Sequence, residues 1–126
     1  MGSESVRVII ADDERLFADA VEAMLSTDGR IVVVARAENG RGALDLAREH
    51  EPDVVLMDIA MPVMDGIEAA RAIRDEVPAT RVVMVTGSAA TDDVSRARSA
   101  GAAGYVTKDR IAGDLVRAIL HAAAPN

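Results

Sequence analysis

The stretch PDVVLMD at residues 52–58 is an apolar run, too short for a helix, that stops abruptly on a carboxylate, Asp58. Four other segments are likewise short, rich in β-branched residues and nearly free of polar alternation: residues 6–11, 31–35, 81–85 and 104–106. Such runs are typical of strands that are buried on both faces of a parallel sheet. The sequence therefore predicts five parallel strands, the third of them at residues 53–57.

Helical patterns lie between the predicted strands. Apolar residues recur at helical spacing in residues 16–25. A second helix is expected to start near Asn39, and a third at Asp65, where Glu68 completes a capping box, before Pro78 ends it. Strands that alternate with helices over short connections predict an α/β fold with right-handed crossovers and helices on both faces of the sheet.

The last two predicted helices differ in their apolar surfaces. The helix of residues 91–100, with Thr91 as its N-cap and Gly101 as its stop, has only a thin apolar stripe. We therefore expect it to dock weakly and to be the most mobile element. The helix of residues 111–123 has a wider apolar arc, which fits either a core-facing side or a contact with a partner, and the sequence leaves both open.

The composition limits the classes of function. A chain of 126 residues forms one domain, which we place at residues 6–123, with a disordered or expression-derived lead-in at 1–5 and the start of a linker or tail at 124–126. The absence of cysteine excludes disulfides and thiolate metal sites, and no apolar stretch approaches the roughly 20 residues of a membrane span. We therefore expect a cytoplasmic protein without a membrane segment. A net charge of −7, with one Tyr, one Phe and no Trp, disfavours nucleic-acid binding by this domain.

Other chemically active residues end predicted strands as Asp58 does. Asp12 and Asp13 follow the first strand, Thr86 the fourth and Lys108 the fifth. Each alone has an ordinary interpretation as a cap or turn residue. Together they would meet at the carboxyl edge of the sheet, where ligands bind in such folds.

Three carboxylates in one crevice would repel one another. A hard divalent cation would relieve this repulsion, and oxygen ligands without His or Cys favour Mg²⁺, or Mn²⁺, over zinc. A lysine and a hydroxyl beside such a cation suit phosphoryl transfer onto a carboxylate. The sequence thus predicts an aspartyl phosphate at Asp58.

The sequence closely resembles the receiver domain of two-component response regulators from about residue 6 to residue 122. The resemblance rests on four motifs in order: ADD at 11–13, VLMDIAMPVMDG at 55–66, VTG at 85–87 and GAAGYVTK at 101–108. It implies a flavodoxin-like doubly wound (βα)5 fold with a five-stranded parallel sheet in strand order 2-1-3-4-5. The opening ADDERLF and the Lys-Asp pair after the last motif are similar to the subfamily with a carboxyl-terminal helix-turn-helix output domain of the nitrate-response type.

This resemblance implies a role for each residue of the site. Asp58 would accept a phosphoryl group from a sensor histidine kinase. Asp13, Asp58 and the backbone carbonyl of Ala60 would bind Mg²⁺ directly, and Asp12 would act through water. Lys108 would pair with the phosphoryl group.

The resemblance also implies a route from phosphorylation to output. Thr86 would hydrogen-bond to the phosphoryl group, as would backbone groups of Gly87 and Ala60, and Tyr105 would change position with Thr86. Tyr105 also has an ordinary interpretation as strand packing. The switch would remodel the face formed by the fourth helix, fifth strand and fifth helix, and a homodimer is expected through this face or the fifth helix.

The resemblance implies a signalling switch, not an enzyme: the domain would promote only its own phosphorylation and dephosphorylation. DNA would be bound only through an output domain absent from these residues.

Three other functions fit parts of the sequence. A Mg²⁺-dependent aspartyl-phosphate phosphatase of the haloacid-dehalogenase kind would need a second Asp where Ala60 stands. A flavin or nucleotide module would need a Gly-rich phosphate loop where residues 12–14 are acidic. A receiver-like scaffold that acts without phosphorylation fits the same fold, although no residue of the phosphorylation site is missing.

Overall fold

The computed structural model describes residues 5–87 and 90–124 and contains one parallel sheet. Its strands are β1 (Val6–Ala11), β2 (Ile31–Ala37), β3 (Val54–Met57), β4 (Arg81–Thr86) and β5 (Gly104–Thr107). Their order is β2-β1-β3-β4-β5, and every neighbouring pair is parallel. The predicted α/β class and strand order are therefore confirmed.

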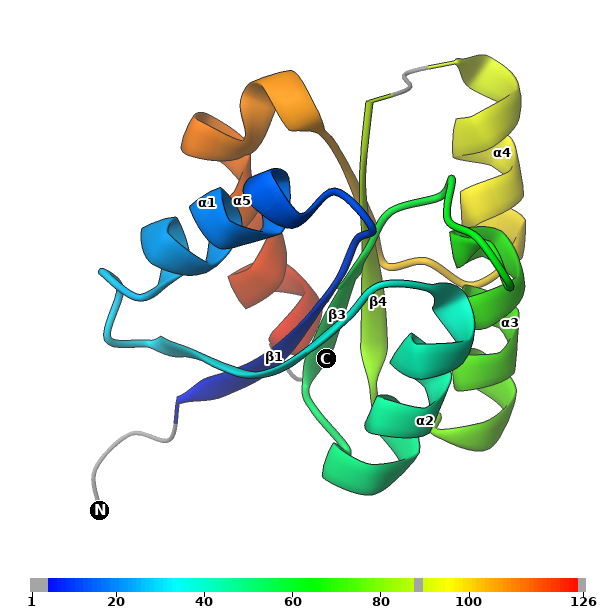
Figure 1. Cartoon of the computed structure of the whole chain (residues 1–126), viewed down its shortest axis with the longest axis horizontal. Coiled ribbons are helices and arrows are strands. Elements are labelled where there is room, and N and C mark those ends of the chain that lie inside the picture. The colour runs from blue at the N-terminus through cyan, green and yellow to red at the C-terminus, as the bar shows by residue number, and fades with distance from the viewer. Residues whose placement is uncertain (1–4, 88–89, 125–126) are drawn as a thin grey trace.

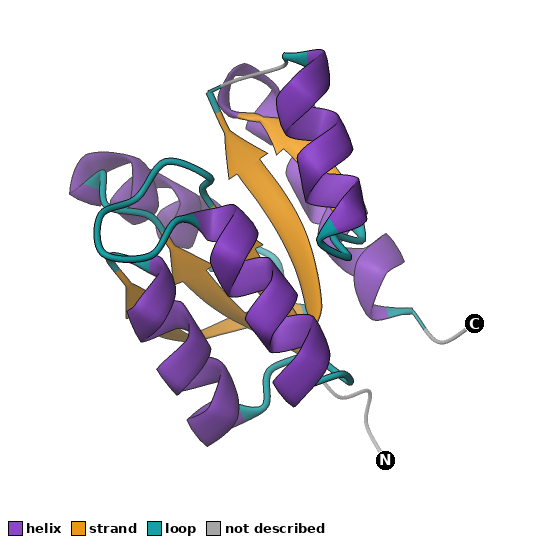
Figure 2. Ribbon diagram, turned by 90° about the vertical axis from the view of Figure 1, so that its right-hand side faces the viewer, coloured by secondary structure: helices purple, strands orange, loops and turns teal. Residues whose placement is uncertain are grey.

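Within the described residues, five α-helices cover the sheet on both sides (Figure 1). They are α1 (Arg15–Leu25), α2 (Gly40–His50), α3 (Gly66–Glu76), α4 (Thr91–Ser99) and α5 (Ile111–Ala123), and a 3-10 turn, η1 (Lys108–Arg110), precedes α5. Helices α1 and α5 lie on one face, and α2, α3 and α4 lie on the other, where they stand in front of the sheet in Figure 2.

The two faces of the sheet carry separate buried clusters. In β3, Val54 and Leu56 belong to the cluster beneath α1 and α5, whereas Val55 and Met57 belong to the cluster beneath α2 and α3. All four side chains are buried, because successive residues of a strand point to opposite faces and both faces are covered. This explains why the sequence of β3 is continuously apolar.

Two of the five helices begin with a side-chain cap, and both caps were predicted from the sequence. Asn39 caps α2 by accepting a hydrogen bond from the Gly42 amide at 2.8 Å, and Asp65 with Glu68 forms the predicted capping box of α3. The prediction that Thr91 is the N-cap of α4 is wrong, because Thr91 is the first helical residue and Ala90 occupies the cap position without a side-chain hydrogen bond. This placement puts Asp92 and Asp93 in the first turn, where the helix dipole favours negative charge.

The strand predictions differ from the structure mainly in β2. This strand continues two residues beyond the predicted end, to Ala37, and includes the charged residue Arg36. Because β2 is an edge strand, the Arg36 side chain can leave the sheet and pair with Asp19 and Glu22 of α1.

Helices α4 and α5 present different amounts of apolar surface to the sheet. Only Ala97 is buried within α4. In α5, Leu115, Ile119 and Ala122 are buried, and the flanking residues Val116 and Leu120 pack against the same cluster. The wide arc of α5 therefore faces the core, whereas the weak docking of α4 and a dimer contact of α5 stay predictions.

The helices and strands run from Val6 to Ala123, and the predicted domain limits stay a prediction. Residues 1–4 and 125–126 lie outside the described part of the chain, so the predicted lead-in and tail stay predictions. Within the described residues, no helix is long and apolar enough to cross a membrane.

Candidate functional site

The sheet brings four polar residues to one edge. In the strand register Ala11 lies opposite Met57, Met57 opposite Met84, and Thr86 opposite Thr107. The residues at or just after these strand ends are Asp12, Asp58, Thr86 and Lys108. In the sheet, β1 has β2 on one side and β3 on the other, so the strand order reverses between β1 and β3 and this edge includes the switch point.

Asp58 is held firmly by its neighbours. Its amide donates to the carbonyl of Ala11 at 3.0 Å, and its Oδ1 accepts from the Ile59 amide at 2.9 Å. Gly66, the first residue of α3, packs directly on it: a Cβ at Gly66 would lie 2.0 Å from the Asp58 carbonyl oxygen. Only glycine therefore allows α3 to start this close to Asp58.

The loop between β3 and α3 is also anchored on α2. A Cβ at Gly40 would lie 2.4 Å from the carbonyl oxygen of Met64, and the Gly40 amide donates to that oxygen at 2.8 Å. At the tip of the loop, Val63 has a φ of 70° and is 83% exposed, and the Met64 amide donates to the Pro62 carbonyl across it. A β-branched residue rarely adopts this left-handed conformation, so the loop holds a strained but well-anchored turn beside Asp58.

Asp12 combines a local and a long-range contact. Its Oδ1 accepts from the Glu14 amide at 2.8 Å, the capping-type role that a lone Asp would have. Its Oδ2 lies 2.9 Å from the Nζ atom of Lys108. The side chain is buried, so Asp12 contributes negative charge to the interior of the site.

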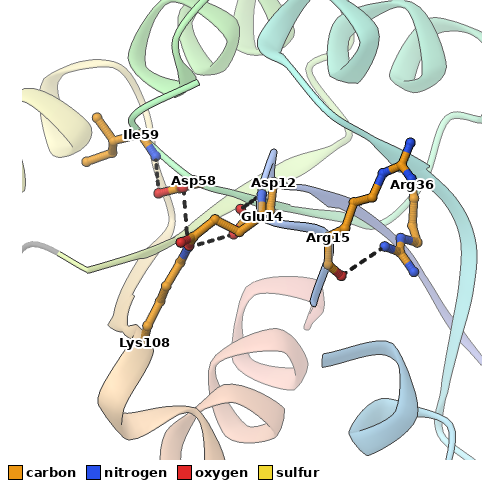
Figure 3. A network of polar contacts seen from close by, with 7 residues as sticks. All are labelled: Asp12, Glu14, Arg15, Arg36, Asp58, Ile59 and Lys108. Carbon is orange, nitrogen blue, oxygen red and sulfur yellow. Dashed lines mark hydrogen bonds and ion pairs between the residues drawn. The ribbon is translucent and has the colours of Figure 1, made fainter. Parts of the chain in front are cut away.

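Lys108 points from the end of β5 into this group of carboxylates (Figure 3). Its ammonium lies 3.4 Å from Oδ2 of Asp58, forms a short ion pair with Glu14, and lies 4.4 Å from the ring centre of Phe17. Burial alone would lower the pKa of Lys108, but hydrogen bonds with Glu14 and Asp12 and the charge of Asp58 outweigh it and raise the pKa above its usual value. Lys108 is therefore positively charged at neutral pH.

The surroundings of Asp58 shift its pKa in opposite directions. Burial and the negative charge of Asp12 raise its pKa, whereas Lys108 and a hydrogen bond from Thr86 act in the other direction. The net shift is upward, so the charged form of Asp58 is not fully compensated by its protein neighbours. A further cation would stabilise it.

The donor set fits a hard divalent cation. Asp12, Glu14 and Asp58 each offer a carboxylate oxygen, and these atoms lie within 4.8 Å of one another. Such an all-oxygen set suits Mg²⁺ or Mn²⁺. Asp13, which the resemblance makes a direct ligand, is exposed and is not a member of this group, and Ala60 lies two residues after Asp58 in the same loop. The separate roles of Asp12, Asp13 and the Ala60 carbonyl stay predictions.

Two residues of the site were not assigned to it from the sequence. Glu14 belongs to an acidic triplet and Phe17 to a helical stripe, and both lie in the ADDERLF segment, but none of these patterns assigns them to the site. Both contact Lys108, which lies far away in the sequence. The available signal was that Glu14 directly follows the Asp12–Asp13 pair and that Phe17 lies in the first turn of α1, because the start of that helix faces the same sheet edge.

The switch residues predicted from the resemblance lie in the expected strands. Thr86 is buried at the end of β4, and the exposed residue Gly87 follows it. Tyr105, opposite Met84 in β5, is partly buried against the core. It also lines a pocket with Val94 and Ala97 of α4, and its role as a switch residue stays a prediction.

Comparison with known sequences identifies close relatives. A family model described as the response regulator receiver domain matches residues 8–120. The probable transcriptional regulatory protein NarL of Mycobacterium tuberculosis is 40% identical over 120 residues, which cover 95% of this chain and 56% of that protein. The transcriptional regulatory protein LnrK of Bacillus subtilis is 36% identical over 115 residues, which cover 91% of this chain and 52% of that protein. The chain thus spans about half the length of these relatives.

Solved structures show the same similarity. The signal receiver domain of the response regulator NarL from M. tuberculosis has a TM-score of 0.92 and 40% identity, covering 96% of this chain and 98% of that one. A LuxR-family two-component response regulator from Aurantimonas has a TM-score of 0.90 and 33% identity, covering 95% of this chain and 86% of that one. These findings confirm the predicted resemblance, including its nitrate-response subfamily. The chain therefore belongs to the family of response regulator receiver domains.

Proposed function

We propose that this domain is a phosphorylation-dependent switch in which Asp58 accepts a phosphoryl group from the phosphohistidine of a sensor histidine kinase. The observation that carries the proposal is the environment of Asp58. Its Oδ1 is fixed by the Ile59 amide, and its Oδ2 faces the ammonium of Lys108 at 3.4 Å. A buried carboxylate with a fixed orientation and an adjacent cation is arranged for attack on an anionic phosphorus centre.

The transfer exchanges one bond to phosphorus for another. A carboxylate oxygen of Asp58 attacks the phosphorus atom, and the bond from phosphorus to the histidine nitrogen breaks as the acyl phosphate forms. Lys108 neutralises a phosphoryl oxygen, while the Thr86 hydroxyl and the backbone amides of Ala60 and Gly87 donate hydrogen bonds to the others. Asp13, Asp58 and the Ala60 carbonyl would hold Mg²⁺ directly and Asp12 would hold it through water, and the bound ion would supply positive charge.

The output face consists of α4, β5 and α5. Thr86 and Tyr105 would carry the change from Asp58 to this face, and α4, with Ala97 as its only buried residue, offers the least resistance to movement. We propose that the remodelled face, or α5 alone, forms a homodimer contact. Because relatives of about twice this length are named transcriptional regulators, the controlled output would be transcription, through a DNA-binding domain outside these residues.

The residue at position 60 argues against a phosphatase that hydrolyses a substrate through an aspartyl phosphate. Ala60 stands where such an enzyme would need a second Asp as its acid and base. We therefore infer a regulatory phosphoacceptor that promotes only its own phosphorylation and dephosphorylation.

The proposal is tested by the intact mass of the protein after incubation with Mg²⁺ and acetyl phosphate. The natural chain and Asp75→Ala, which removes an exposed carboxylate of α3, should each gain one phosphoryl group. Asp58→Ala should gain none. Labelling of Asp58→Ala to the same extent would show that another residue is the acceptor, and an unlabelled natural chain would favour a scaffold that acts without phosphorylation.

A further inference from the structure

Lys108 is the only lysine in the sequence, and the N–H donors of its ammonium already have carboxylate partners. An ammonium has three N–H donors. In the structure, Asp12, Glu14 and Asp58 all lie within ion-pair distance of it, and the Phe17 ring lies beside it. A phosphoryl oxygen that approaches Lys108 must therefore displace one of these carboxylates.

The three carboxylates differ in how easily they can leave. Asp12 and Asp58 are buried, and each is held by a second hydrogen bond, from the amides of Glu14 and Ile59. The side chain of Glu14 is 63% exposed and reaches the ammonium from the start of α1. Water can replace the lost contact of Glu14 but not that of a buried carboxylate, so Glu14 is displaced at the lowest desolvation cost.

We infer that Glu14 is a positioning residue that holds Lys108 in the unphosphorylated protein and competes with the phosphoryl group for its ammonium. This inference rests on the proposed function of Asp58. When the phosphoryl group forms, Lys108 exchanges Glu14 for a phosphoryl oxygen, and the Glu14 carboxylate returns to water. Glu14 thus sets how readily the site accepts an anion.

The chain offers a matched control for this contact. Glu38 is also an exposed carboxylate, with 64% of its side chain accessible, and it follows β2 at the same edge of the sheet. It pairs with Arg15 and not with Lys108. Glu14→Gln and Glu38→Gln therefore remove the same charge from the same region, but only Glu14→Gln removes the contact with Lys108.

The first measurement concerns the unphosphorylated protein. Lysine labelled with ¹⁵N at the side chain gives a single ammonium NMR signal, because the sequence has one lysine. Glu14→Gln should shift this signal and speed its hydrogen exchange several-fold, whereas Glu38→Gln should leave it at its natural position. An unchanged signal in Glu14→Gln would overturn the inference whether or not Asp58 is ever phosphorylated.

The second measurement is a titration with beryllofluoride, a mimic of the acyl phosphate, at saturating Mg²⁺. Glu14→Gln should lower the midpoint roughly two- to five-fold, the range that an ion pair with an exposed partner supplies, and Glu38→Gln should match the natural chain. A midpoint that is equal in both variants, or higher in Glu14→Gln, would show that Glu14 does not compete. Failure of the proposed function would instead appear as an unlabelled natural chain in the mass experiment.

Discussion

The ammonium of Lys108 lies 2.9 Å from Oδ2 of Asp12, although the two residues follow strands β5 and β1, which β3 and β4 separate in the sheet. The long lysine side chain spans this width and also approaches Asp58 on the way. The single cation of Lys108, which follows the edge strand β5, thus forms ion pairs with the carboxylates that follow β1 and β3.

Replacement of Lys108 should therefore destabilise the domain. Lys108→Met keeps the apolar stem but leaves Asp12 and Asp58 buried without their cation, so the free energy of unfolding should fall by about 1–3 kcal/mol at neutral pH without metal. Urea unfolding measures this change, and added Mg²⁺ should recover part of it. Arg110→Met, which removes an exposed cation two residues away, should have little effect, and equal losses in both variants would contradict the shared-cation interpretation.

Removal of the charge of Asp58 should have the opposite effect. Burial and Asp12 raise the pKa of Asp58, which means that its charged form costs the folded state stability at neutral pH. Without metal, Asp58→Asn should melt a few degrees higher than the natural chain, the shift that about 1 kcal/mol gives in a domain of this size.

Mg²⁺ provides the control for this effect. Millimolar Mg²⁺ should raise the melting temperature of the natural chain, because a ligand that binds only the folded state stabilises it. The rise should be smaller in Asp58→Asn and unchanged in Asp75→Asn. If Mg²⁺ does not change the melting temperature of the natural chain, this result would argue against a cation site at these carboxylates.

Two glycines allow a test of how tightly α3 is packed on Asp58. Gly66→Ala would place a Cβ 2.0 Å from the Asp58 carbonyl oxygen, and the forced backbone movement should cost roughly 1–3 kcal/mol and slow phosphorylation. Gly113, in the first turn of α5, has open space around its Cα, so Gly113→Ala should stabilise the protein by about 0.5–1 kcal/mol. Chemical denaturation of both variants checks the prediction, which fails if Gly66→Ala is as stable as Gly113→Ala.

Tyr105 provides a direct reporter of the switch. It is the only tyrosine, and the chain has no tryptophan, so intrinsic fluorescence reports on this residue. Beryllofluoride with Mg²⁺ should change the fluorescence of the natural chain, and Thr86→Val, which removes the hydroxyl, should lose most of this change while still binding the mimic. Thr80→Val removes a buried hydroxyl that donates to Pro52 at 2.7 Å, away from the site, and should keep the full change. An undiminished response in Thr86→Val would exclude Thr86 as the link to Tyr105.

Local patterns were sufficient to predict most of the fold. The buried residues of β3 show continuous apolarity, and Asn39 and Asp65 cap their helices through contacts within three residues. Thr91 was misplaced by one residue, because threonine favours the cap position and the acidic pair that follows it fits the first turn with the cap at either Ala90 or Thr91.

Contacts between distant segments could be predicted only in part. The motifs located Asp58 and Lys108, because strand ends meet at one edge of a parallel sheet. The pairing of Glu14 with Lys108 depends on the reach and direction of two long side chains, which spacing along the chain does not encode. For the same reason the sequence did not indicate that Glu14, rather than Asp13, would pair with Lys108.

The two buried clusters on either side of the sheet also decide where the domain can deform. Bending the sheet would open close-packed layers on both faces at once, whereas the site lies entirely on the rim where the strands end. The sheet is therefore the rigid part of the domain, and under the proposed function a signal that starts at Asp58 would pass along the carboxyl edge of the sheet as an exchange of polar partners, without distortion of the sheet itself.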